Sequence, residues 1–150
     1  MDSLTAFDWV FIISAALFNL LIAGIFIAQK FNNETYTKNF GIAWLLLFFP
    51  LLAAFIGFLV NGKPAWVFIC LGVVFVYMLV EFLLDYVFKF NFRKSWLTHA
   101  PYIVLEYAAL FSLIAIAIDI NKPLSWVVAA CFWLLMGSLI FLYAGKKKTA

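Results

Sequence analysis

The chain has little charge, a single histidine and only two cysteines in 150 residues. Charged residues make up 11% of it and hydrophobic residues 68%, whereas a soluble domain is roughly a quarter charged and about half apolar. A soluble protein of this size could not cover so much apolar surface. The composition therefore excludes a soluble globular domain and indicates a membrane protein.

Several kinds of functional site are excluded because their residues are missing. Cys70 and Cys131 have no metal-type spacing and fall inside apolar segments, so we interpret them as small hydrophobic side chains. One histidine and no Glu-x-x-His pair leave no recognised metal site. No glycine-rich phosphate loop and no serine or cysteine triad is present. The sequence predicts no metal and no cofactor, and it leaves open whether the protein is an enzyme.

The first segment lacks the basic region with which a signal peptide begins. Its flank is acidic, and the apolar run that follows is too long for a signal peptide, so we interpret it as a retained membrane span. Asp8 follows Thr5 by three residues, a spacing typical of a capping box at the start of a helix.

Long apolar runs are what the sequence has in abundance, and its mean hydropathy is +1.11. Each run is near the length that crosses a hydrocarbon layer of ~30 Å, and continuous runs without turns argue against strands. The predicted fold class is therefore all-α, a polytopic bundle of five transmembrane helices forming a single integral membrane domain over residues 1–150. The predicted helices are residues 9–29, 40–60, 65–88, 97–118 and 124–144. We expect a kink at Pro50, inside the second helix.

Basic residues are unequally divided between the two sides of this predicted bundle. Eight lie on one side, namely Lys30, Lys38, Lys89, Arg93, Lys94, Lys146, Lys147 and Lys148, and two on the other, Lys63 and Lys122. The positive-inside rule then places the N-terminus outside and the C-terminus in the cytoplasm of a cell (inner) membrane. This topology explains the basic excess, so we expect the lipid bilayer and no nucleic acid as a partner.

Ionisable residues inside the apolar segments gather near one hairpin, formed by the helices predicted at 65–88 and 97–118. The link between them is centred between Arg93 and Lys94, and Glu81 and Glu106 each lie 12.5 positions from that centre. Residues equally far from the centre of a hairpin lie at similar depth. The sequence therefore predicts that the two glutamates are level, two to three turns inside the cytoplasmic face.

Two polar stripes follow from helical spacing on this hairpin. One stripe is Tyr77, Glu81 and Asp85, which are four residues apart. The other is His99, Tyr102 and Glu106, which are three and four residues apart. If both stripes face inward, they form one pocket. The predicted ligand-binding residues are Tyr77, Glu81, Asp85, His99, Tyr102 and Glu106. For Asp85 and His99 the alternative is an interfacial role, in which Asp85 pairs with Lys89 or Arg93.

The two glutamates are the candidates for chemistry. A carboxylate inside a membrane helix costs about 2.5–3.5 kcal/mol on insertion scales, so such residues are functional candidates. Glu81 and Glu106 would repel each other if both were ionised, so we expect one of them to hold its proton at neutral pH. Such a pair is a candidate catalytic acid or base, and it is also a candidate cation site.

Three functions remain open at this stage. The leading prediction is a protein that binds a lipophilic small molecule or lipid in a cytoplasm-facing intramembrane pocket, with the glutamate pair at its polar end. The first alternative is proton- or cation-coupled transport, although the helices predicted at 9–29, 40–60 and 124–144 carry no charge. The second alternative is an accessory or assembly subunit whose polar cluster binds a second copy of the chain or another membrane protein.

Overall fold

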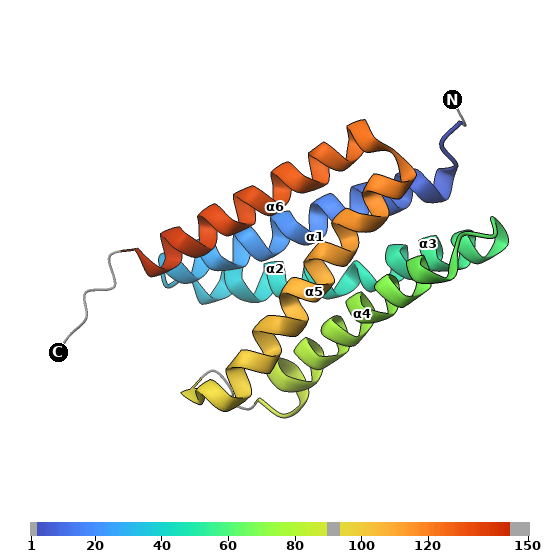
Figure 1. Cartoon of the computed structure of the whole chain (residues 1–150). Helices are drawn as coiled ribbons and strands as arrows, with labels where there is room; N and C mark the ends of the chain where they lie inside the picture. Colours follow the sequence, from blue (N-terminus) through green and yellow to red (C-terminus); the bar gives the residue numbers. More distant parts are fainter. Residues whose placement is uncertain (1–2, 90–93, 145–150) are drawn as a thin grey trace.

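A computed structural model of the protein describes residues 3–89 and 94–144, and the described residues form helices linked by short turns (Figure 1). Five helical stretches are long and apolar enough to cross a membrane, which confirms the predicted all-α bundle and indicates an integral multi-pass membrane protein. The elements are α1 (Ala6–Lys30), α2 (Glu34–Leu46), α3 (Phe48–Val60), α4 (Ala65–Phe82), the π-helix η1 (Leu83–Val87), α5 (Trp96–Ile120) and α6 (Lys122–Tyr143). The second span joins α2 to α3, and the third joins α4 to η1.

The start of α1 is fixed by the predicted capping box. Thr5 Oγ1 accepts a hydrogen bond from the backbone N–H of Asp8 at 3.2 Å, and Asp8 Oδ2 accepts one from the backbone N–H of Thr5 at 2.8 Å. These bonds satisfy two donors that a helix N-terminus otherwise leaves without acceptors.

The second span differs from its prediction at both the start and the middle. It begins at Glu34, six residues before the predicted boundary at residue 40, because the Asn33 side chain caps the helix by accepting from Tyr36 N–H at 3.2 Å. The helix is interrupted at Leu47, between α2 and α3. Pro50 lies three residues further on, where its ring disfavours the preceding turn, so the expected break occurs.

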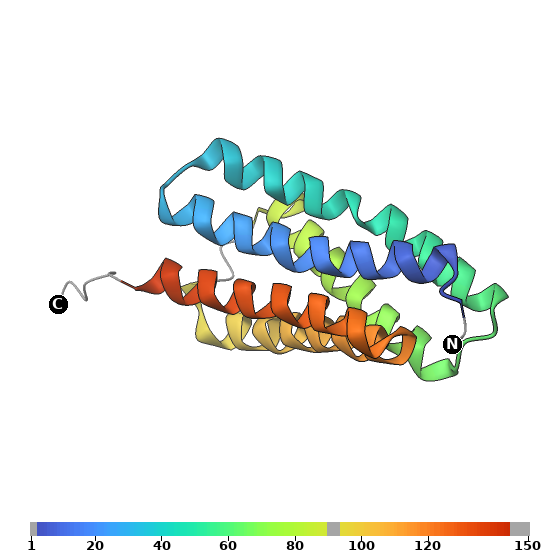
Figure 2. The ribbon, with the colours of Figure 1, turned by 90° about the horizontal axis from the view of Figure 1, so that it is seen from above.

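Helix α1 is the centre of the bundle. It contacts α2, α3, α5 and α6, and Figure 2 shows it between the α2–α3 pair and α6. Its buried face carries Phe11, Ala15 and Phe18, all fully buried. Helix α4 packs mainly on α5 and joins the bundle through that hairpin.

The helix ends divide into two groups. The ends of α1, η1 and α6 and the starts of α2 and α5 lie together, and we call this the basic end (Figure 1). The opposite end holds the start of α1, the α3–α4 turn and the α5–α6 turn. The basic end carries Lys30, Lys38, Lys89 and Lys94, and the opposite end carries Lys63 and Lys122. Arg93 and residues 146–148, which complete the predicted count, lie outside the described residues.

Candidate functional site

A cavity of about 740 Å³ lies between α1, α2, α4, η1, α5 and α6 in the half of the bundle near the basic end. This volume is within the range of sites that bind small molecules. Along α5 its lining runs from His99 to Leu110, a depth of about 16 Å at 1.5 Å per residue. The cavity therefore reaches well into the apolar part of the bundle.

The cavity is open at one end and closed at the other. Its lining near the basic end includes exposed residues such as Asn32, Glu34 and Lys38. Its inner lining includes Trp44 and Leu110, which are 3% and 1% exposed. Access from water is thus from the basic end.

All six residues of the predicted pocket line this one cavity. They differ in exposure, because Tyr77 and Tyr102 are buried, whereas Asp85 is exposed at the rim. The structure therefore brings the two predicted stripes together on facing helices. Their role in binding stays a prediction and is taken up below.

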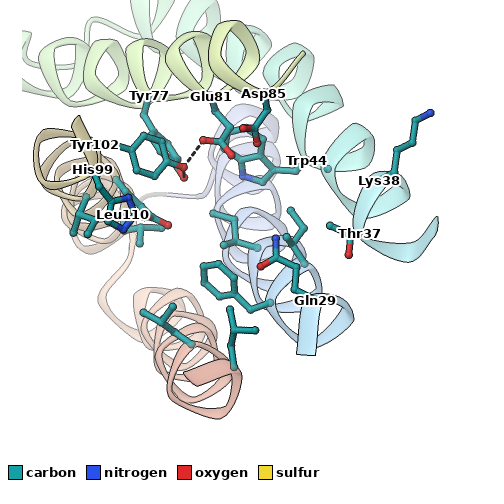
Figure 3. A pocket seen from close by; sticks show the side chains of 18 of the residues that line it. Gln29, Thr37, Lys38, Trp44, Tyr77, Glu81, Asp85, His99, Tyr102 and Leu110 are labelled. Atoms are coloured by element: carbon teal, nitrogen blue, oxygen red, sulfur yellow. Dashed lines mark hydrogen bonds between the residues drawn. The ribbon is translucent and has the colours of Figure 1, made fainter. Parts of the chain in front are cut away.

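Hydrogen bonds join the two stripes at the inner end of the cavity (Figure 3). The Tyr102 hydroxyl donates to Glu81 Oε2, and the hydroxyl oxygens of Tyr77 and Tyr102 lie 3.2 Å apart within hydrogen-bonding distance. These contacts tie α4 to α5 and hold the Glu81 carboxylate in one orientation.

Tyr102 is the hydrogen-bonding partner of Glu81 across the hairpin, and the equal depth of Glu81 and Glu106 stays a prediction. The Glu81–Tyr102 pair has its midpoint at position 91.5, and the Lys63–Asp119 ion pair (3.6 Å) at the far end of the hairpin has its midpoint at 91. The predicted centre was 93.5. Since η1 ends at Val87 and α5 begins at Trp96, the link is centred nearer the third span than expected.

Glu106 consequently lies four residues beyond Tyr102, about 6 Å further from the basic end. It still lines the cavity, one turn before Leu110. The expected sharing of a proton between Glu81 and Glu106 stays a prediction. Both glutamates line the same cavity from facing helices.

Aromatic rings form a floor along one side of the cavity. The ring of Trp44 on α2 lies 5.0 Å from Phe18 on α1 and 5.5 Å from Tyr77 on α4, measured between centroids. Tyr77 continues to Tyr102 at 5.8 Å, and His99 stacks on Tyr102 at 6.3 Å with an interplanar angle of 15°. We call these five residues the aromatic floor. It connects four helices on one side of the cavity, which continues along α5 past His99 and Tyr102 to Glu106 and Leu110.

Trp44 also has a polar atom at this floor. Its Nε1–H is buried and has no hydrogen-bond partner within residues 3–89 and 94–144. In Figure 3 the indole lies beside the Glu81 and Asp85 carboxylates, with its nitrogen turned toward the open space. A buried donor without an acceptor costs free energy, so this atom calls for an acceptor that enters the cavity.

The cavity residues that the sequence prediction missed include Glu34, Lys38 and Trp44. Glu34 and Lys38 line the mouth because α2 starts early, and the Asn33 cap with an acidic residue in the first turn was the signal that could have placed them. Trp44 lies in the middle of an apolar run, and no local pattern distinguishes a floor residue there from a lipid-facing one.

The π-helix η1 shapes the rim. Its wider turn lets two consecutive residues, Asp85 and Tyr86, both line the cavity. The Tyr86 hydroxyl rests on α2 at Gly41, where an added Cβ would lie 2.7 Å from the hydroxyl oxygen. A glycine at position 41 therefore permits the close approach of η1 to α2.

Negative groups outnumber positive ones along the lining. Glu34, Glu81, Asp85 and Glu106 line it, and Lys38 is the lysine or arginine that the described lining contains. Within the described ranges, no three His, Cys, Asp or Glu side chains gather closely enough to hold a metal ion. The cavity is therefore suited to a ligand that is positively charged or donates hydrogen bonds.

No known protein family, curated protein or solved structure matches the chain. The cavity itself is then the feature from which a function can be argued: its amphipathic lining, its carboxylates at two depths and its single open end.

Proposed function

We propose that this integral membrane protein binds a lipophilic small molecule or lipid in the cavity, with the polar end of the ligand at Glu81 and Glu106. The observation that carries the proposal is an amphipathic cavity with one open end. Carboxylates and tyrosine hydroxyls line one side, and apolar side chains line the other. The apolar side is formed by Ile22, Ile25, Phe26, Leu110, Met136 and Leu139.

The closed inner end favours binding over transport. Beyond the inner lining at Leu110, most side chains at the bundle centre are apolar and buried, among them Leu51, Phe58, Leu71 and Leu113, and the buried polar ones such as Ser14 and Asn19 are uncharged. An ion that crossed the bundle would need polar groups along this path. A cavity that ends against such a core can hold a lipophile and offers an ion no continuation.

We further propose that the basic end lies in the cytoplasm, so that the cavity opens on that side. A variant with Cys70 and Cys131 replaced by alanine provides the background for labelling. Ser95→Cys, exposed at the basic end, should resist a membrane-impermeant thiol reagent added to intact cells, whereas Asn61→Cys, exposed at the opposite end, should react. The reverse pattern would overturn the orientation and leave the cavity unaffected.

Binding can be tested with two photoreactive probes of equal chain length, a sixteen-carbon amine and a sixteen-carbon alcohol, each with a diazirine on the chain. In nanodiscs we expect saturable labelling of peptides that contain residues 22–29 and 136–142, with competition by the unlabelled probe. Glu106→Gln should weaken amine binding about ten- to a hundredfold, because a charge-assisted hydrogen bond is lost. The isosteric change leaves the volume nearly unchanged.

The matched control is Asp119→Asn, the same loss of charge at the opposite end and outside the cavity lining. It should leave labelling unchanged. Equal effects of the two variants, or labelling that does not saturate with either probe, would contradict the proposal.

Two other results would favour the alternative functions. A proton or sodium flux in proteoliposomes that Glu81→Gln abolishes would establish transport. A membrane partner that co-purifies with the wild type and is lost in Glu106→Gln would establish an accessory subunit.

A further inference from the structure

The inner end of the cavity makes two different chemical demands on a ligand. The carboxylates of the lining attract a positive charge and accept hydrogen bonds, and the Trp44 indole needs an acceptor. We infer that the ligand is a lipophilic amine whose nitrogen lies within two or three bonds of a hydrogen-bond-accepting oxygen, as in a long-chain amino alcohol. This inference rests on the proposed function and specifies the ligand class of the same site.

The charge of the lining selects an amine over an anion. Four carboxylates face one lysine, and that lysine, Lys38, is exposed at the mouth, four residues after Glu34 on the same helix. An anionic ligand such as a fatty acid or phospholipid phosphate would meet Glu81 and Glu106, whereas the lysine of the described lining is at the mouth. Like charges at short range in an apolar surrounding repel strongly.

The surrounding rings and carboxylates favour a protonated amine with N–H groups. Tyr77 and Tyr102 present aromatic rings beside Glu81, and a cation beside such rings is stabilised by their quadrupoles. A carboxylate also accepts hydrogen bonds from N–H donors, which a quaternary ammonium lacks. A primary amine satisfies both groups.

The acceptor requirement comes from Trp44 independently of the charges. Trp44 is 3% exposed, and its Nε1–H lacks an acceptor among the residues described. Its ring contacts Tyr77 at 5.5 Å, and the Tyr77 hydroxyl lies 3.2 Å from that of Tyr102, the donor to Glu81. Donor and carboxylate thus belong to one contiguous patch, so a ligand needs its oxygen close to its nitrogen to reach both.

The experiment uses the full chain in nanodiscs and three probes with the same chain length: hexadecylamine, hexadecanol and 2-amino-1-hexadecanol. We expect the amino alcohol to bind about three- to tenfold tighter than the amine, the size of one neutral hydrogen bond. The amine should in turn bind more tightly than the alcohol. These ratios are measured on the wild type, so they do not depend on whether a variant folds.

Trp44→Phe assigns the extra affinity to the indole. It should reduce amino alcohol binding to the level of the amine and leave amine binding within about twofold, since one neutral hydrogen bond is removed. Trp133→Phe, at a position 70% exposed and outside the cavity lining, is the matched control and should change neither. In ¹⁵N NMR the indole resonance missing in Trp44→Phe should shift with the amino alcohol and stay in place with the amine.

Equal affinities of the amine and the amino alcohol in the wild type would overturn the inference, as would equal weakening of both by Trp44→Phe. Tighter binding of the alcohol than of the amine would overturn the requirement for charge. These results leave the proposed function intact, which is contradicted if no probe occupies the cavity or if Glu106→Gln and Asp119→Asn have equal effects.

Discussion

The two halves of this bundle use the same five spans in opposite ways. In the half near the opposite end, fully buried apolar side chains fill the space between helices, among them Phe11 and Phe58, whose rings are 5.7 Å apart. In the half near the basic end, the helices surround a cavity of about 740 Å³ lined by carboxylates and tyrosines. The comparison teaches that a small membrane protein can keep its packing in one half and leave the other half free to bind.

The aromatic floor connects helices of the two halves. It takes Phe18 from α1, Trp44 from α2, Tyr77 from α4 and two residues from α5, so it ties four helices together. These contacts let the helices stand apart around the cavity without loosening the packed half. Substitutions made in each half separately test this division.

The largest effect is expected in the packed half. Phe58→Ala should lower the free energy of unfolding by about 3–5 kcal/mol, because it leaves a cavity beside Phe11 in a fully buried core. Unfolding in mixed micelles with increasing sodium dodecyl sulfate measures this change. Phe49→Ala, at a position 66% exposed on the same helix α3, is the control and should cost far less. Similar costs at the two positions would refute a packed half.

A smaller loss of stability is expected from the bridge between α4 and α5, the hydrogen bonds that the Tyr102 hydroxyl makes with Glu81 and Tyr77. Tyr102→Phe removes the hydroxyl that donates to Glu81 and contacts the Tyr77 hydroxyl, so it should cost about 1.5–3 kcal/mol, the range for bonds to charged groups. Tyr36→Phe, an exposed tyrosine on α2, is the control. If Tyr102→Phe leaves the unfolding curve unchanged, the bridge does not hold α4 to α5.

A still smaller loss of stability is expected at the rim of the cavity, and a second substitution should reverse it. Gly41→Ala places a methyl group 2.7 Å from the Tyr86 hydroxyl oxygen, which has to move, at a cost of about 1 kcal/mol. The second change Tyr86→Phe should restore the stability, since it removes the atom in conflict. Gly72→Ala on α4, where an added Cβ has no neighbour within 4 Å, should not be destabilising. Failure of the double variant to recover would show that Tyr86 does not rest on α2.

The smallest effect is expected at the surface of the opposite end. Lys63→Met removes the ion pair with Asp119, whose side chains are 25% and 35% exposed, and should change stability by about 0–1 kcal/mol because water and salt screen the pair. The change should not depend on bound ligand. A larger loss, or one that alters probe binding, would mean that the ends of the bundle are coupled.

Much of the fold was predictable because hydropathy and charge are local properties of a segment. The five spans, the grouping of the described lysines at the two ends and the Thr5–Asp8 cap all follow from neighbouring residues. The presence of Tyr77, Glu81, Tyr102 and Glu106 in one cavity also follows, since helical spacing sets the stripes and a short link makes the helices antiparallel.

What the sequence by itself determined is therefore the number of spans, the end at which ionisable groups collect and the residues of each polar stripe. Only the tertiary structure decided that Glu81 accepts a hydrogen bond from Tyr102, because the pairing of positions across the hairpin depends on where η1 ends and α5 begins. It also decided that Trp44, more than thirty residues before Tyr77, forms the floor against it. Contacts between distant segments depend on how whole helices pack, and no local pattern encodes that packing.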